Sequence, residues 1–113
     1  MKDWDAVAKY ALSLPDTEAS TSYGQPAIKT RGKMFVSTGH VDGSFHVRSP
    51  HDEKAVLLAT DPDSFWQTPH YEPWPGLQVR YGTSNPVRVA RVIARAWWDQ
   101  AAAKQRKAYG DRP

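Results

Sequence analysis

The segment Thr68–Gly76, with the sequence TPHYEPWPG, gathers side chains that could do chemistry. His70 could serve as a general base near neutral pH, and Tyr71 and the nearby Trp66 could stack on a flat ligand. No nucleophile with a positioned base, glycine-rich phosphate loop or carboxylate pair accompanies His70. The pattern therefore predicts that the chain is not an enzyme. It leaves two interpretations, a ligand-binding or protein-interaction site centred on residues 68–76, or a loop stiffened by its prolines.

Metal and cofactor chemistry is not indicated by the sequence. The four histidines, at positions 40, 46, 51 and 70, show no short ligand spacing such as H-x₃-H. The chain has no cysteine, which removes thiolate metal sites, disulfides and thiol nucleophiles, and which fits a reducing compartment. We therefore expect no metal site and no cofactor.

A second set of candidate residues is basic. Lys29, Lys33, Arg48 and Arg80 lie on or beside predicted strands, and Trp74 could add a ring contact to a nucleic acid. The formal net charge of +3 also favours anionic partners. No base-reading motif is present, so the hypothesis is weak, sequence-independent binding to double-stranded DNA. The alternative is that these charges only solvate the surface of the sheet.

Helices are predicted where apolar residues recur every three or four positions. The first is capped by Asp3 and runs to about Leu14. A short helix opens at Ser49 and Pro50, with Ser49 as its N-cap, and ends near residue 59. The longest helix starts at Asn85–Pro86, and its apolar stripe comprises Val89, Val92, Ile93, Ala96 and Trp97.

Strands are predicted where apolar and polar residues alternate. Residues 27–48 contain three short strands joined by turns at Arg31–Gly32 and Asp42–Gly43, and residues 64–71 and 76–82 contain two more. The polar segment 16–26 is predicted to be a loop. Strict two-residue turns would place Ile28 and Phe45 on opposite faces, so we expect a bulge or a longer loop at Gly39.

The elements in the order α-β-β-β-α-β-β-α predict a two-layer α+β domain. An antiparallel sheet of about five strands carries the helices on one face. Residues 1–103 form this single domain, and residues 104–113 form a basic C-terminal tail that is expected to fray. No apolar stretch approaches the roughly 20 residues that span a bilayer, and the N-terminus lacks a signal-peptide core. We therefore expect a cytoplasmic protein without membrane association, and a monomer.

Two motifs connect the chain to a known family. Tyr23–Gly24 and Pro26 are followed by Gly32–Lys33–Met34–Phe35, and Thr68–Pro69–His70–Tyr71 comes later in the chain. In order and spacing the chain resembles the MmcQ/YjbR family over roughly residues 8 to 100. The resemblance implies a CyaY-like, or frataxin-like, antiparallel sheet backed by helices. Members are commonly described as DNA-binding by analogy with double-winged folds. The segment EPWPGLQVR departs from the family pattern, so no family role is carried over to Trp74.

Overall fold

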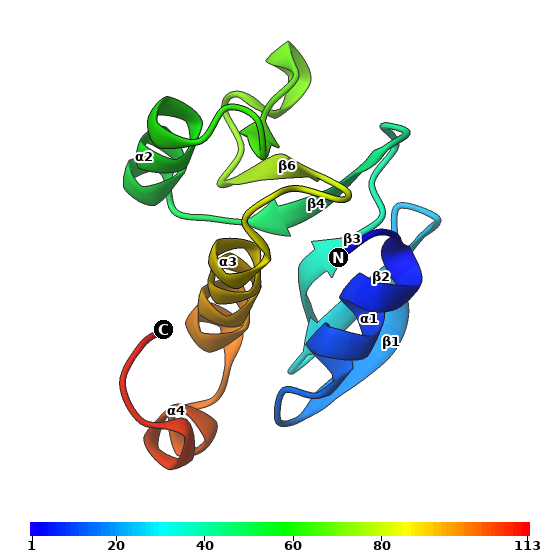
Figure 1. The fold of residues 1–113 in the computed structure, drawn as a ribbon. Coiled ribbons are helices and arrows are strands. Elements are labelled where there is room, and N and C mark those ends of the chain that lie inside the picture. Colours follow the sequence, from blue (N-terminus) through cyan, green and yellow to red (C-terminus); the bar gives the residue numbers. More distant parts are fainter.

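The computed structural model describes all 113 residues and contains one six-stranded antiparallel sheet (Figure 1). The strands lie in the order β1-β2-β3-β4-β6-β5. They are β1 (Thr17–Ser22), β2 (Gln25–Thr30), β3 (Lys33–Ser37), β4 (Ser44–Arg48), β5 (Phe65–Trp66) and β6 (Gly76–Arg80). The helices are α1 (Trp4–Leu12), α2 (His51–Thr60), α3 (Pro86–Gln100) and α4 (Ala103–Tyr109), with a short 3₁₀ helix η1 (Pro69–Tyr71).

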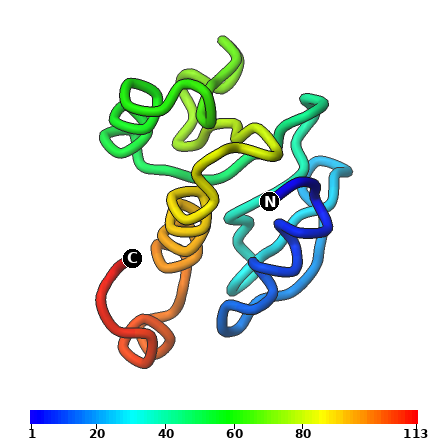
Figure 2. Tube along the Cα trace, viewed as in Figure 1, coloured from blue at the N-terminus to red at the C-terminus, as the bar shows by residue number.

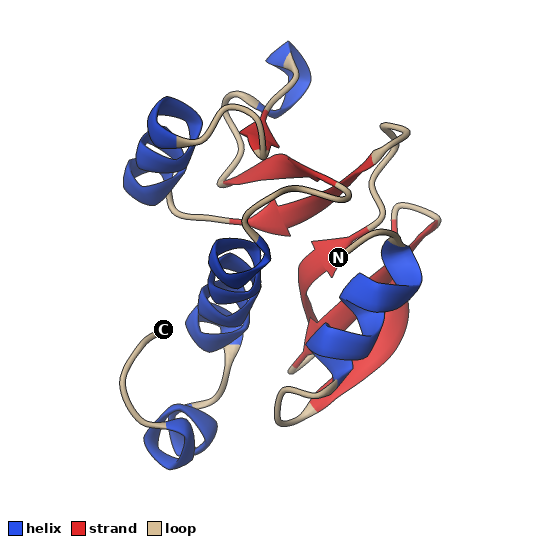
Figure 3. Ribbon diagram, in the orientation of Figure 1, coloured by secondary structure: helices blue, strands red, loops and turns tan.

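The helices and the sheet form the two layers that the sequence predicts. Figure 3 shows α1 packed over β1 and β2, α3 crossing the middle of the sheet, and α2 beside β6. The core lies between these layers, where Ile28, Val36 and Val47 of adjacent strands meet Ile93 and Trp97 of α3. The α+β class is confirmed. No helix combines the length and the apolar character that crossing a bilayer requires.

Helices α1 and α3 follow directly from their caps and apolar stripes. The Asp3 carboxylate accepts a hydrogen bond from the Ala6 amide at 2.9 Å and opens α1. Asn85 caps α3 in the same way, with Pro86 at the first helical position. The predicted stripe of α3 is fully buried: Val89, Val92, Ile93, Ala96 and Trp97. Local periodicity is enough to orient this helix because one face meets the sheet.

The sequence predicts that an irregularity shifts the strand register so that the apolar residues share one face. In the structure this shift lies in the β2–β3 pair. Ile28 pairs with Val36 while Lys29 pairs with Met34, so Phe35 is the extra residue of a bulge. Phe35 and Val36 are both completely buried as a result. A bulge was expected at Gly39, and the β3–β4 connection there is a loop longer than two residues. Together these features put Ile28, Val36 and Val47 on one face of the sheet.

The first strand corrects the predicted number of strands. Thr17–Ser22 falls in the polar segment that was expected to be a loop, and it pairs with β2 at the edge of the sheet. An edge strand is held by backbone hydrogen bonds on one side, and it needs no apolar alternation when its side chains stay exposed. The sheet therefore has six strands, one more than expected.

Three further segments differ from the prediction. The strand expected over residues 64–71 ends at Trp66, because Pro69 lacks an amide donor and starts η1 instead. Ser49 does not cap α2, because Pro50 occupies the N-cap position and no side chain accepts from the first helical amides. The Ser49 amide instead donates to the Pro75 carbonyl at 2.9 Å. The C-terminal segment expected to fray contains α4. Figure 2 shows the chain turning back after α3, so that its end lies near that helix.

Candidate ligand-binding cleft

A cleft of ≈ 740 Å³ opens on the sheet face opposite the core. Its floor includes Ser37 of β3 and His46 of β4, which are paired across the strands. These two residues alternate with the core residues Val36 and Val47, so they face the other way. One wall is the Tyr23 tip of the β1–β2 hairpin, and the opposite wall is the loop that follows β5.

The charge of the cleft is positive. Lys33 and Arg48 line it, and no aspartate or glutamate does. Neither cation has an ion pair or a side-chain hydrogen bond elsewhere in the protein. Three histidines, His40, His46 and His70, also line the cleft. No group of three histidine, aspartate or glutamate side chains is placed to hold a metal ion.

His46 is a buried polar residue of the floor without a hydrogen-bond partner for its ring Nε2. Its side chain is 8% exposed, and its ring lies 4.8 Å from the Tyr71 ring. Burial, together with the charges of Arg48 and Lys54, lowers the pKa of His46 to about 4. The imidazole is therefore neutral at pH 7. Its fit depends on Gly76, where a Cβ atom would lie 2.6 Å from His46 Nε2.

Lys54 of α2 anchors the wall formed by residues 69–76, which we call the cleft loop. Its Nζ donates to the backbone carbonyls of Tyr71 (2.9 Å), Glu72 (3.1 Å) and Trp74 (2.7 Å). The side chain is 3% exposed, so three carbonyls compensate a buried ammonium group. Sequence reasoning missed this residue. The available signal was a lysine three positions before Leu57, on the helix face that enters the core.

The cleft unites two sets of residues that the sequence treated separately. Lys33, Arg48 and Trp74 come from the predicted DNA-contacting set, and His70 and Tyr71 come from the predicted ligand-contacting set. The Trp74 side chain is half exposed and belongs to the wall formed by the cleft loop.

The other three predicted site residues lie outside the cleft. The Arg80 guanidinium lies 4.9 Å from the centre of the Trp66 ring, and Trp66 Nε1 donates to Ser44 Oγ at 2.9 Å. Lys29 on β2 stands opposite Glu18 on β1, so a carboxylate neighbours it in the sheet. The predicted DNA-contacting set is thus divided between the cleft and two other positions.

Tyr23 lines the cleft and was not among the predicted site residues. It occupies the two-residue turn between β1 and β2 with φ of 51°, and its side chain is 89% exposed. A non-glycine residue in this left-handed region is strained, and asparagine or glycine is the usual choice there. The hairpin therefore holds an exposed aromatic ring at the cleft at some cost in backbone energy.

Fold and cleft together describe a small α+β domain with a basic, aromatic-lined concavity. The YjbR family model matches residues 12–99, and the chain belongs to this family. The crystal structure of Deinococcus radiodurans protein DR2400, a DUF419 domain, is similar with a TM-score of 0.75 at 13% identity, covering 96% of this chain and 88% of that one. At this identity the similarity concerns the fold. No curated protein matches the chain.

Proposed function

We propose that the protein binds a small anionic ligand that carries a flat ring, and that the cleft is the binding site. The observation that carries the proposal is the lining of the cleft, which has two cations without ion pairs, Lys33 and Arg48, and no carboxylate. An anion entering such a concavity gains charge-assisted hydrogen bonds and meets no like charge. The volume of ≈ 740 Å³ falls within the range of ordinary ligand pockets.

The rest of the lining suits the ring of the ligand. Tyr71 and the half-exposed Trp74 offer aromatic surface on one wall, and Tyr23 offers it on the other. The neutral His46 supplies a buried nitrogen that lacks a partner. No hydroxyl group of the cleft is hydrogen-bonded to a histidine. We therefore propose binding without a chemical step, in keeping with the expectation that the chain is not an enzyme.

Adenosine monophosphate, inorganic phosphate and adenosine together test the proposal, because only the first has both the charge and the ring. When adenosine monophosphate is titrated into the protein, we expect the amide NMR signals of Ser37, His46 and the cleft loop to shift. The nucleotide should bind at least about tenfold more tightly than either fragment, since it makes both kinds of contact.

Two matched variants locate the site. Arg48→Gln should weaken nucleotide binding by about tenfold, the usual loss for a hydrogen bond to a charged group. Arg80→Gln removes an exposed arginine outside the cleft and should leave binding unchanged. Equal weakening by both variants, or an absence of cleft shifts at millimolar nucleotide, would reject the proposal.

A second candidate function is binding to double-stranded DNA. It is favoured by the lack of any ion pair to Lys29, Lys33 or Arg80, which leaves cations available inside and outside the cleft. Log affinity should then fall with log salt by about 0.9 per phosphate contacted. The double variant Lys29→Gln/Arg80→Gln should reduce that slope by up to about 2 and leave nucleotide binding intact. An absence of duplex binding at low salt would exclude this function.

A further inference from the structure

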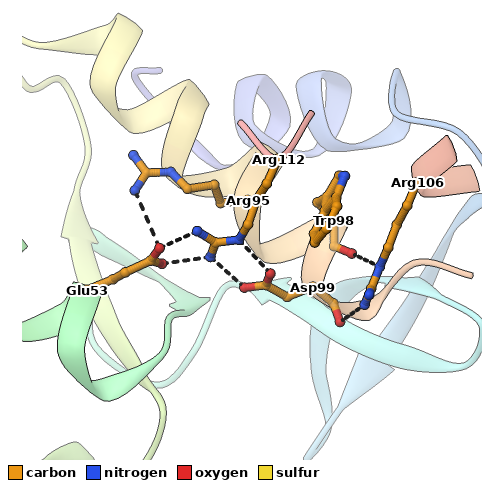
Figure 4. Close-up of polar contacts among 6 residues, drawn as sticks. All are labelled: Glu53, Arg95, Trp98, Asp99, Arg106 and Arg112. Atoms are coloured by element: carbon orange, nitrogen blue, oxygen red, sulfur yellow. Dashed lines mark hydrogen bonds and ion pairs between the residues drawn. The ribbon is translucent and has the colours of Figure 1, made fainter. Parts of the chain in front are cut away.

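The C-terminal residues 102–113, which we call the C-terminal strap, bring Arg112 between two carboxylates. Figure 4 shows its guanidinium bridging Glu53 of α2 and Asp99 of α3. Nε donates to Asp99 Oδ1 at 2.8 Å, Nη2 donates to Asp99 Oδ2 at 2.9 Å and to Glu53 Oε2 at 2.8 Å, and Nη1 donates to Glu53 Oε1. Both carboxylates are thus bound in bidentate fashion by one arginine. These hydrogen bonds, to Asp99 first and then Glu53, raise the pKa of Arg112.

The strap is held mainly by such polar contacts. Arg106 donates to the carbonyls of Trp98 (2.8 Å) and Asp99 (2.7 Å), and its guanidinium lies 4.5 Å from the centre of the Trp98 ring. The Tyr109 ring lies 5.1 Å from the Trp97 ring, but no residue of α4 is buried. The position of the strap therefore depends on charge more than on apolar burial.

Arg48 connects this cluster to the cleft. It lines the cleft, and it also borders a narrow crevice, too small for a water molecule, together with Glu53, Arg95 and Asp99. Arg95 Nη1 lies 4.0 Å from Glu53 Oε1. The two positive charges of Arg95 and Arg112 therefore balance the two negative charges of Glu53 and Asp99. Arg48 is left as the surplus cation, and it makes no ion pair or hydrogen bond.

We infer that Arg112 is a positioning residue for the cleft, because its occupation of Glu53 and Asp99 leaves Arg48 free to meet an anionic ligand. The inference rests on the proposed ligand-binding function. Without Arg112, Arg95 would be the only ion-pair partner left to Glu53 and Asp99. Arg48 would then pair with the uncompensated carboxylate, and the cleft would lose one of its two cations.

A cycle of full-length variants tests this coupling through nucleotide affinity. Arg112→Gln should weaken adenosine monophosphate binding about three- to fivefold, the upper part of the range for one partly exposed charge pair. Asp99→Asn alone should not weaken it. The double variant Arg112→Gln/Asp99→Asn restores the charge balance and should bind within about twofold of the wild type. The differences in nucleotide affinity between these variants should shrink at high salt, because salt screens charge pairs. A loss of packing would not respond to salt in this way.

A measurement without ligand separates this inference from the proposed function. The side-chain Nε–H signal of Arg48 in nitrogen-15 NMR should shift and exchange more slowly with water in Arg112→Gln, and return in the double variant. If the wild type binds no nucleotide, the proposed function is wrong. The Arg48 signal still shows whether Arg112 controls the pairing of Arg48. An unchanged Arg48 signal in Arg112→Gln, or a double variant as weak as the single one, overturns the inference. Circular dichroism of each variant checks that it folds.

Discussion

At the residue scale, His46 is the cleft residue whose pKa is shifted by the fold. It is nearly fully buried, its ring lies 4.8 Å from that of Tyr71, and it lies in the field of Arg48 and Lys54. A positive charge on its ring would lose hydration and would be repelled by these two cations. The folded protein therefore resists protonation of His46, whereas the unfolded chain does not. This difference makes stability depend on pH in a predictable direction.

The pKa of His46 is lowered from 6.5 to about 4 on folding. Below pH 6.5 the unfolded state takes up a proton that the folded state refuses. The free energy of unfolding should therefore be undiminished above pH 6.5 and should fall by up to about 3 kcal/mol as the pH drops to 4. Urea unfolding at several pH values measures the fall.

The substitution His46→Gln should flatten this pH dependence, and His51→Gln, at an exposed histidine, is the control. An equal pH dependence in the wild type and His46→Gln would assign the effect to another group.

At the element scale, one wall of the cleft depends on a helix behind it. The cleft loop has three prolines and the short η1, and the side chain that holds its carbonyls belongs to α2. Lys54 also contributes a positive charge next to His46. The same helical turn carries Glu53, which binds the strap. The start of α2 thus connects the cleft loop and the C-terminal strap to one rigid element.

Lys54→Met should remove the anchor while retaining much of the side-chain volume. Three carbonyls would lose their donor, and we expect a loss of about 2–4 kcal/mol in the free energy of unfolding. Hydrogen exchange should accelerate at the amides of Trp74 and Gly76, which bond within the cleft loop.

Lys104→Met changes an exposed lysine of α4 and should alter neither quantity. If the cleft-loop amides exchanged at wild-type rates in Lys54→Met, Lys54 would not be the anchor.

At the scale of the whole molecule, few large apolar side chains are exposed. The large apolar side chains that remain exposed, such as Leu12, Val56 and Val87, belong to different elements. The radius of gyration of 13.0 Å is that of a chain of this length folded as one unit. We therefore propose that the protein is a monomer, as the sequence led us to expect.

Sedimentation velocity tests this directly. A single species of 12.7 kDa should persist from micromolar to near-millimolar concentration. A species of twice that mass would contradict the proposal.

The sequence by itself determined the elements whose signals are local. The buried stripe of α3, the Asp3 cap of α1 and the strands β2, β3, β4 and β6 follow from spacing, caps and turns within a few residues. The α+β class follows from their order, and the family follows from the motifs at residues 23–35 and 68–71. β1 escaped prediction because a polar edge strand has no apolar period.

Tertiary structure alone decided the site. Lys54 meets carbonyls 17 to 20 residues away, and Arg112 meets a carboxylate 59 residues away. No local pattern marks such partners, because the fold brings them together. For the same reason the sequence could name Lys33, Arg48, His70 and Trp74 as candidates without showing that they share one cleft, from which Lys29 and Arg80 are absent.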